Sequence, residues 1–144
     1  MKINPTGNSV VFGTHGGLSK VEVCSLKPDG SLVYLKTFDL GLSSALLHID
    51  WTTDGKSVVL NSQAYELMFF DIVGGTKINA SSAKDWTYYT WTCKLGFPVQ
   101  GIFPGVDLTD VNDVCRSHNQ KVLASGEDSS LVKLFKYPCT QEKA

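Results

Sequence analysis

Residues 119–137 read NQKVLASGEDSSLVKLFKY: a turn, a short apolar strand, a small-polar turn and a second strand with alternating polarity. Residues 7–26, GNSVVFGTHGGLSKVEVCSL, and residues 55–72, GKSVVLNSQAYELMFFDI, follow the same plan. The first strands of the three copies begin at valines that are 48 and then 64 residues apart: Val10, Val58 and Val122. Paired strands that recur about every 40–50 residues are typical of β-propeller blades.

Alternating polarity, together with β-branched and aromatic residues, predicts strands along most of the chain. These strands are Ser9–Phe12, Lys20–Leu26, Leu32–Phe38, Ala45–Trp51, Ser57–Leu60, Glu66–Ile72, Lys77–Ile78, Asp113–Arg116, Lys121–Ser125 and Leu131–Tyr137. Pro28-Asp29-Gly30 and Asp54-Gly55 predict turns between them. Within residues 80–104, which lengthen the period, Trp86–Leu95 is predicted to form an outer strand or hairpin arm and Val99–Phe103 a strand. No segment shows the periodicity of a helix.

The strand pattern predicts an all-β chain of about three consecutive blades, which is a partial propeller. Residues 1–40 are expected to form a blade that lacks its first strand, residues 41–84 a blade, and residues 85–144 an insertion followed by a blade. Propellers close with about four to eight blades. Because each blade buries its apolar face only against its neighbours, we expect the flanks to contact the remaining blades of a parent chain or a second copy.

Composition narrows the range of partners. The net charge of −1 does not provide the basic field of a protein that binds nucleic acid or a membrane surface. The N-terminal residues lack the apolar core of a secretory signal, and no apolar run reaches the ~18 residues that span a bilayer. The four cysteines form no C-x-x-C pair, so we expect reduced thiols, no metal site and a cytosolic setting.

The last copy, Gln120–Tyr137, resembles a WD40 repeat, with Ala124-Ser125-Gly126 on the strand, Asp128 in the turn and Phe135 at the tryptophan position. Longer motifs resemble the echinoderm microtubule-associated protein-like (EMAP-like) family. They are Ile49–Lys56, Asn61–Leu67, Trp91-Thr92-Cys93 with Leu95-Gly96-Phe97, Thr109–Asn112 leading to Cys115–Asn119, and Lys133-Leu134-Phe135 with Tyr137-Pro138-Cys139.

This resemblance implies a place in a tandem propeller module of about thirteen blades in two fused rings, associated with tubulin and partner proteins. It implies a non-enzymatic scaffold of the cytoplasm and cytoskeleton, without a cofactor. The basic, coiled-coil segment that targets members of this family to microtubules has no counterpart among these residues.

Six residues are candidates for contacts with a partner. Trp86, Tyr88, Tyr89 and Trp91 form an aromatic insertion, and insertions in repeat proteins often lie on the binding face. The alternative is that these rings cover the core between blades. Arg116 and His118 either contact an acidic partner such as tubulin or form hydrogen bonds within their blade.

Other patterns favour a structural role over a chemical one. Gly55-Lys56-Ser57 resembles the end of a phosphate-binding loop, but its flanks predict strand–turn–strand. His48 and Asp50 share a strand face without a positioned nucleophile. The aspartates at positions 107, 110 and 113 are expected to cap turns. Two alternatives stay open: a purely structural propeller segment, or a small-ligand propeller that uses Asp50, Asn112 and Asp113.

Overall fold

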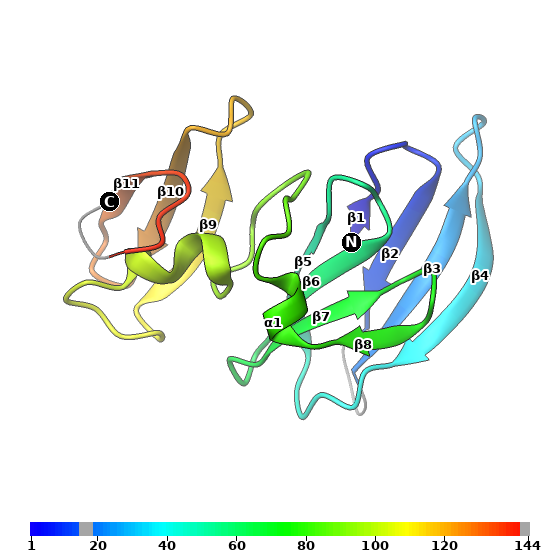
Figure 1. Cartoon of the computed structure of the whole chain (residues 1–144), viewed down its shortest axis with the longest axis horizontal. Coiled ribbons are helices and arrows are strands. Elements are labelled where there is room, and N and C mark those ends of the chain that lie inside the picture. The colour runs from blue at the N-terminus through cyan, green and yellow to red at the C-terminus, as the bar shows by residue number, and fades with distance from the viewer. Residues whose placement is uncertain (15–18, 142–144) are drawn as a thin grey trace. The chain divides into compact units, whose positions relative to one another are not determined.

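The computed structural model describes residues 1–14 and 19–141, and the chain divides into two compact units, Met1–Tyr89 and Thr90–Ala144. Residues 15–18, in the first predicted small-polar turn, lie outside the described residues. The strands form sheets of four, four and three antiparallel strands, each in sequence order (Figure 1). The prediction of an all-β chain of blade-like sheets is therefore confirmed.

The first sheet consists of β1 (Lys2–Ile3), β2 (Ser9–Gly13), β3 (Lys20–Leu26) and β4 (Leu32–Asp39). The turn between β3 and β4 is held by Asp29, whose carboxylate accepts hydrogen bonds from the Ser31 amide at 2.9 Å and the Ser31 hydroxyl at 2.7 Å. The expectation that this blade lacks its first strand was wrong, because β1 pairs with β2. A strand of two residues is too short to show alternation in the sequence.

The second sheet consists of β5 (Leu46–Trp51), β6 (Ser57–Ser62), β7 (Leu67–Asp71) and β8 (Thr76–Ile78). The predicted turn at Asp54-Gly55 joins β5 to β6, and Gly55 adopts φ +68°, which glycine tolerates best. Strand β6 is buried on both faces, with Val58, Val59 and Leu60 fully inaccessible. It is the most enclosed strand of the unit and positions the turns at its two ends.

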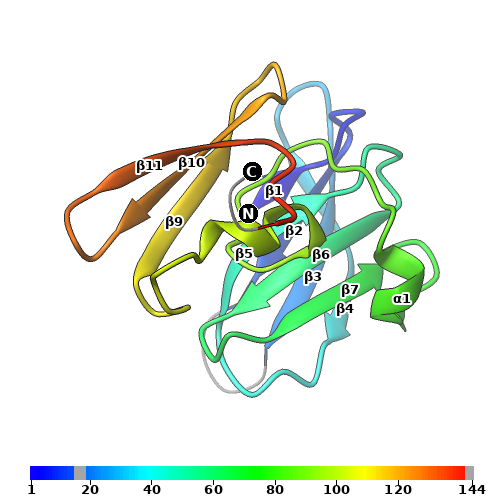
Figure 2. The same ribbon diagram turned by 60° about the vertical axis from the view of Figure 1, so that its left-hand side comes forward.

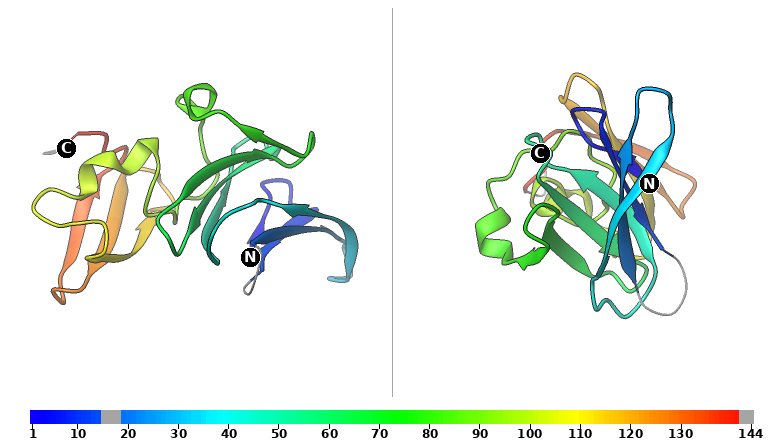
Figure 3. Two further views of the ribbon diagram at one scale, coloured as in Figure 1. Left: turned by 90° about the horizontal axis from the view of Figure 1, so that it is seen from below. Right: turned by 90° about the vertical axis from the view of Figure 1, so that its right-hand side faces the viewer.

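The two sheets of the first unit lie next to each other (Figure 3), and they share one apolar core. Val11, Val21 and Val23 of the first sheet pack with Ile49 and Trp51 of the second in a single buried cluster. Complete burial of one such aliphatic side chain stabilises the fold by about 1.5–3 kcal/mol. The buried valines of β2 and β3 therefore help to hold one sheet against the other.

The segment between the second and third sheets departs from the prediction. Trp86–Leu95 contains no strand; its one β-type pairing is an isolated bridge between Tyr88 and Thr52. Val99–Phe103 is not a strand either, because Phe97–Ile102 forms a 3₁₀ helix, η1. A short helix, α1 (Ala80–Ala83), also precedes the segment and is capped by the Asn79 side chain. Aromatic content favours strands only where a paired, half-buried surface is available.

The third sheet, in the second unit, consists of β9 (Val111–Arg116), β10 (Val122–Glu127) and β11 (Val132–Lys136) (Figure 2). Strand β10 is central, and β11 is an edge strand. After β11 the chain returns to η1. There the Cys139 amide donates a hydrogen bond to the Pro98 carbonyl, and the Gly101 amide donates one to the Cys139 carbonyl, both at 2.8 Å. These two hydrogen bonds hold the segment after β11 against η1.

Candidate interaction site

Trp86 lies half-buried on the outer side of the second sheet. Its ring meets the buried Phe69 of β7 edge to face, with centroids 5.8 Å apart and planes at 88°. Its amide donates to the Ala83 carbonyl at the end of α1. The α1 helix lies beside β7, so Asn79 to Thr87 form a small cap over this side of the blade (Figure 1). The indole is thus packed against β7 and remains partly accessible.

Tyr88 and Trp91 are core residues. Tyr88 is 3% exposed and forms an isolated β-bridge with Thr52. The neighbouring Tyr89 amide donates a hydrogen bond to the Trp51 carbonyl. Trp91, 1% exposed, packs its indole directly against Gly96. The prediction of contacts with a partner therefore needs correction for these two residues, because buried rings do not reach a partner's surface. Trp86 and Tyr89, which is 51% exposed, remain as accessible aromatics.

A surface hollow of about 690 Å³ opens next to Trp86, and we call it the Trp86 hollow. It lies between the β5–β6 turn, the end of β7 and the cap, and its walls include Asp54, Lys56, Asp71, Val73, Asp85 and Trp86. Of the six predicted site residues, Trp86 alone is among the residues lining it. The sequence singled out Gly55-Lys56-Ser57 only as a phosphate-loop fragment, whereas the structure confirms a strand–turn–strand hairpin there.

The carboxylates of the Trp86 hollow differ in their surroundings. Asp54 accepts hydrogen bonds from the Thr52 hydroxyl at 2.6 Å and the Lys56 amide at 3.1 Å. The Thr52 hydrogen bond is the main reason that the pKa of Asp54 lies below its ordinary value. Asp71 accepts from the Val73 amide at 2.9 Å. Asp85 is exposed, and its carboxylate makes no hydrogen bond or ion pair within residues 1–14 and 19–141.

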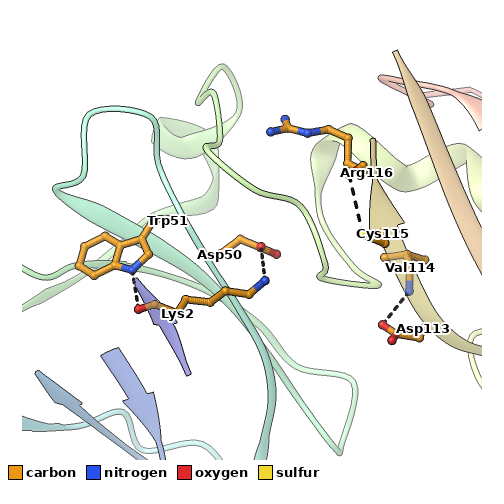
Figure 4. Close-up of polar contacts among 7 residues, drawn as sticks. All are labelled: Lys2, Asp50, Trp51, Asp113, Val114, Cys115 and Arg116. Carbon is orange, nitrogen blue, oxygen red and sulfur yellow. Dashed lines mark hydrogen bonds and ion pairs between the residues drawn. The ribbon is translucent and has the colours of Figure 1, made fainter. Parts of the chain in front are cut away.

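The first strands of the first two sheets, β1 and β5, carry a partly buried polar cluster (Figure 4). Asp50 of β5 is inaccessible, and its carboxylate lies 3.8 Å from the ammonium of Lys2 on β1. The Trp51 indole donates to the Lys2 carbonyl at 3.1 Å. Asp50 is thus paired with Lys2 inside the fold. The alternative of a small-ligand propeller, which depends on Asp50, Asn112 and Asp113, therefore loses one of its three residues.

Arg116 and His118 have different environments in the second unit. Arg116 is half-buried, and its guanidinium lies 5.0 Å from the Tyr137 ring centroid and donates to the Tyr137 hydroxyl at 3.4 Å. A cation over an aromatic ring stabilises the pair by about 0.5–2 kcal/mol. His118 is exposed in the β9–β10 turn. The contacts of Arg116 agree with the interpretation that it forms hydrogen bonds within its blade.

The acidic segment before β9 is a set of turns. Asp107 accepts from the Thr109 amide and hydroxyl, and the Asp107 amide donates to Asp110 at 2.9 Å. The bonds from Thr109 lower the pKa of Asp107 below its ordinary value. Across the residues that the structure describes, no three His, Cys, Asp or Glu side chains are grouped closely enough to hold a metal ion. The prediction that these aspartates cap turns is confirmed for Asp107.

Exposed apolar side chains mark the outer strands of two sheets. In the first unit they lie on edge strand β4, and in the second on β11 and the turn before it: Leu32, Val33, Tyr34, Leu35, Leu131, Val132 and Leu134. Val132 and Leu134 are 73% and 72% exposed. Apolar residues on an unpaired edge strand are a template for pairing with another strand.

The whole chain, residues 1–144, matches the family described as the echinoderm microtubule-associated protein second beta-propeller. The chain belongs to the EMAP-like family. It is 37% identical over 147 residues to human echinoderm microtubule-associated protein-like 3 and 35% identical over 148 residues to rat echinoderm microtubule-associated protein-like 1, both over 100% of this chain. It is 47% identical over 107 residues, 72% of this chain, to human echinoderm microtubule-associated protein-like 4.

This EMAP-like chain spans only 16%, 18% and 11% of the lengths of those three relatives. Among solved structures, it is similar to a putative 6-phosphogluconolactonase from Bacteroides uniformis at 18% identity and a TM-score of 0.47, over 94% of this chain and 34% of that one. That similarity is too low to transfer any activity. Within the part of the chain that the structure describes, no helix is long and apolar enough to cross a membrane.

Proposed function

We propose that this EMAP-like chain is a non-enzymatic interaction module of a microtubule-associated protein, with tubulin or microtubules as a partner in the cytoplasm and cytoskeleton. The observation that carries the proposal is the match of all 144 residues to the second propeller of that family, together with relatives that are named as microtubule-associated protein-like. The blades act as a rigid support, and turns and the residues between sheets make the contacts.

The accessible aromatics support this role. Tyr89 is 51% exposed at the end of the first unit, and Trp86 is half-buried beside the hollow. Aromatic side chains that lose their remaining exposed area against a partner often supply more than 1 kcal/mol of binding free energy each. Tyr89 is the residue to test, because its ring is the more exposed of the two and Trp86 also supports Phe69.

Microtubule co-sedimentation tests the proposal. The chain is measured alone and in a chimera that replaces the matching segment of human echinoderm microtubule-associated protein-like 3. We expect pelleting that depends on microtubules, weak for the isolated chain and stronger for the chimera. Tyr89→Ala is expected to reduce the association constant by about tenfold, which corresponds to about 1.4 kcal/mol.

Tyr65→Ala is the matched control, since Tyr65 is also an exposed tyrosine of the first unit, at 40%. It is expected to pellet like the unmodified chain. Failure of both the isolated chain and the chimera to pellet above the level without microtubules would overturn the tubulin assignment. Equal losses in the two tyrosine variants would reject Tyr89 as a contact residue.

A purely structural role is the second candidate, and the exposed apolar residues of β4 and β11 favour it. In that case these strands contact further blades or a second copy, and the chain touches no other partner. Its signature is self-association without microtubule binding.

A further inference from the structure

We propose that the Trp86 hollow binds a basic segment of a protein partner, with an arginine side chain seated between the indole of Trp86 and the carboxylate of Asp85. Such a site does not depend on tubulin being the partner. It rests on the size of the hollow, on the charges that line it and on the partly accessible indole in its wall.

The size of the hollow fits a peptide segment. A volume of about 690 Å³ is within the range of ~300–1,000 Å³ that is typical of ligand sites. The hollow is formed where the segment after β8 returns across the β5–β6 turn. Extra segments between repeats commonly line the binding face of repeat proteins. Val73 is 69% exposed at this site and offers an apolar contact to the stem of a long side chain.

The charged residues that line the Trp86 hollow favour a cationic ligand. Asp54, Asp71 and Asp85 line the hollow, and Lys56 is the one cationic residue among the described residues that line it. The field is therefore negative and repels phosphate groups and acidic peptides. The carboxylates are also dispersed, since the described residues contain no group of three suited to a metal ion. Dispersed carboxylates favour an extended cationic ligand over a single ion.

The chemistry of the walls favours arginine. A guanidinium stacks on an indole and forms paired hydrogen bonds to a carboxylate, whereas an ammonium acts as a point charge. Asp85 is available for that pairing because its carboxylate has no hydrogen bond or ion pair within the described chain. Asp54, in contrast, is already held within its turn, because its Oδ1 accepts hydrogen bonds from both Thr52 and Lys56.

A titration followed by fluorine NMR tests the proposal on the full chain. The three tryptophans are labelled with 5-fluorotryptophan, and the Trp86 signal is assigned with Trp86→Phe. The probe is the peptide acetyl-Gly-Arg-Gly-Arg-Gly-amide, and its matched control carries citrulline, a neutral isostere, at both arginine positions. We expect the arginine peptide to shift the Trp86 signal selectively and the citrulline peptide to bind at least fivefold more weakly.

Three charge variants sharpen the test. Asp85→Asn is expected to weaken binding at least threefold, and Lys56→Met to strengthen it by about twofold or more. Glu22→Gln, which removes one negative charge from β3, outside the hollow, is expected to leave the dissociation constant unchanged. Calcium chloride is titrated separately and is expected to leave the Trp86 signal in place.

Several results would overturn the proposal. They are an unmoved Trp86 signal, equal affinity for the arginine and citrulline peptides, equal weakening by Asp85→Asn and Glu22→Gln, or a calcium-induced shift that competes with the peptide. Unchanged signals of the buried Trp51 and Trp91 verify that each variant is folded. Because this readout contains no microtubules, its outcome is independent of the co-sedimentation result.

Discussion

The indole nitrogen of Trp51 donates a hydrogen bond to the main-chain carbonyl of Lys2 at 3.1 Å, and this bond joins β5 to β1, the first strands of their two sheets (Figure 4). Trp51 is 1% exposed and belongs to the core cluster that both sheets share. Short strand β1 is therefore held from two directions, by its pairing with β2 and by the side chain of Trp51 on β5.

Trp51→Phe is expected to lower the free energy of unfolding by about 1–3 kcal/mol, because it removes the donor to Lys2 and leaves a small cavity. Urea unfolding of the first unit, followed by circular dichroism, measures the loss. Trp86→Phe is the control and is expected to cost less than about 1 kcal/mol, since Trp86 is more accessible than Trp51. A larger loss for Trp86→Phe than for Trp51→Phe would contradict this account of the core.

Glu66→Gln is expected to destabilise the chain at neutral pH and to have less effect in acid. The Glu66 carboxylate accepts from the Ser62 hydroxyl at 2.6 Å and from the amide and hydroxyl of Ser43 at 3.2 and 3.1 Å. The Ser62 bond is the main reason that its pKa lies below the ordinary 4.5.

Because the folded state holds Glu66 at a lowered pKa, its contribution is complete above pH 4.5 and is lost as the pH falls through the folded pKa. Urea midpoints of both proteins at pH 7 and pH 3 check the sign. Ser62→Ala removes the main donor and is expected to reproduce part of the same pH dependence. A difference between wild type and Glu66→Gln that is equally large at both pH values would show that the charge is not involved.

Gly96→Ala is expected to destabilise the second unit by about 1–3 kcal/mol, since the added methyl group would overlap the ring of the buried Trp91. Gly126→Ala, on β10 of the same unit, is the matched control, because no atom lies within 4 Å of a methyl group added there. We expect it to change the free energy of unfolding by no more than about 0.5 kcal/mol. Chemical unfolding of both variants tests the comparison, and equal losses would disprove close packing at Gly96.

The isolated chain is expected to self-associate through the exposed apolar residues of β11. Leu134→Lys, at a position that is 72% exposed, is expected to shift the population toward monomer in sedimentation velocity runs at tens of micromolar. Leu108→Lys places the same charge at a 42% exposed loop leucine of the same unit and is expected to have little effect. A monomeric wild-type chain at these concentrations would refute the expectation.

Strand positions could be predicted closely because local alternation encodes them. The predicted Lys20–Leu26 coincides with β3, and the predicted Ser57–Leu60 falls within β6. The turn at Asp29 was predictable as well, since a short carboxylate side chain captures a nearby amide within the turn. In each case the physical cause acts over a few residues, so one sequence suffices to find it.

Other features depend on contacts between distant segments. The aromatic segment from Trp86 to Trp91 looked like a strand or a surface, yet Tyr88 and Trp91 are buried and only Trp86 and Tyr89 are accessible. The Trp86 hollow was not predictable, because its carboxylates come from positions 54, 71 and 85. No local pattern reveals which of many surface aspartates lie next to each other after folding.

By itself, the sequence determined the strand order, the repeat and the family, because alternation, turn residues and extended motifs are properties of neighbouring residues. Only the tertiary structure decided that Asp50 is engaged by Lys2, that β1 completes the first sheet and that Trp86 borders an acidic hollow. The reason is that burial and charge pairing depend on contacts between side chains that are far apart in the sequence, and local sequence patterns do not reveal those contacts.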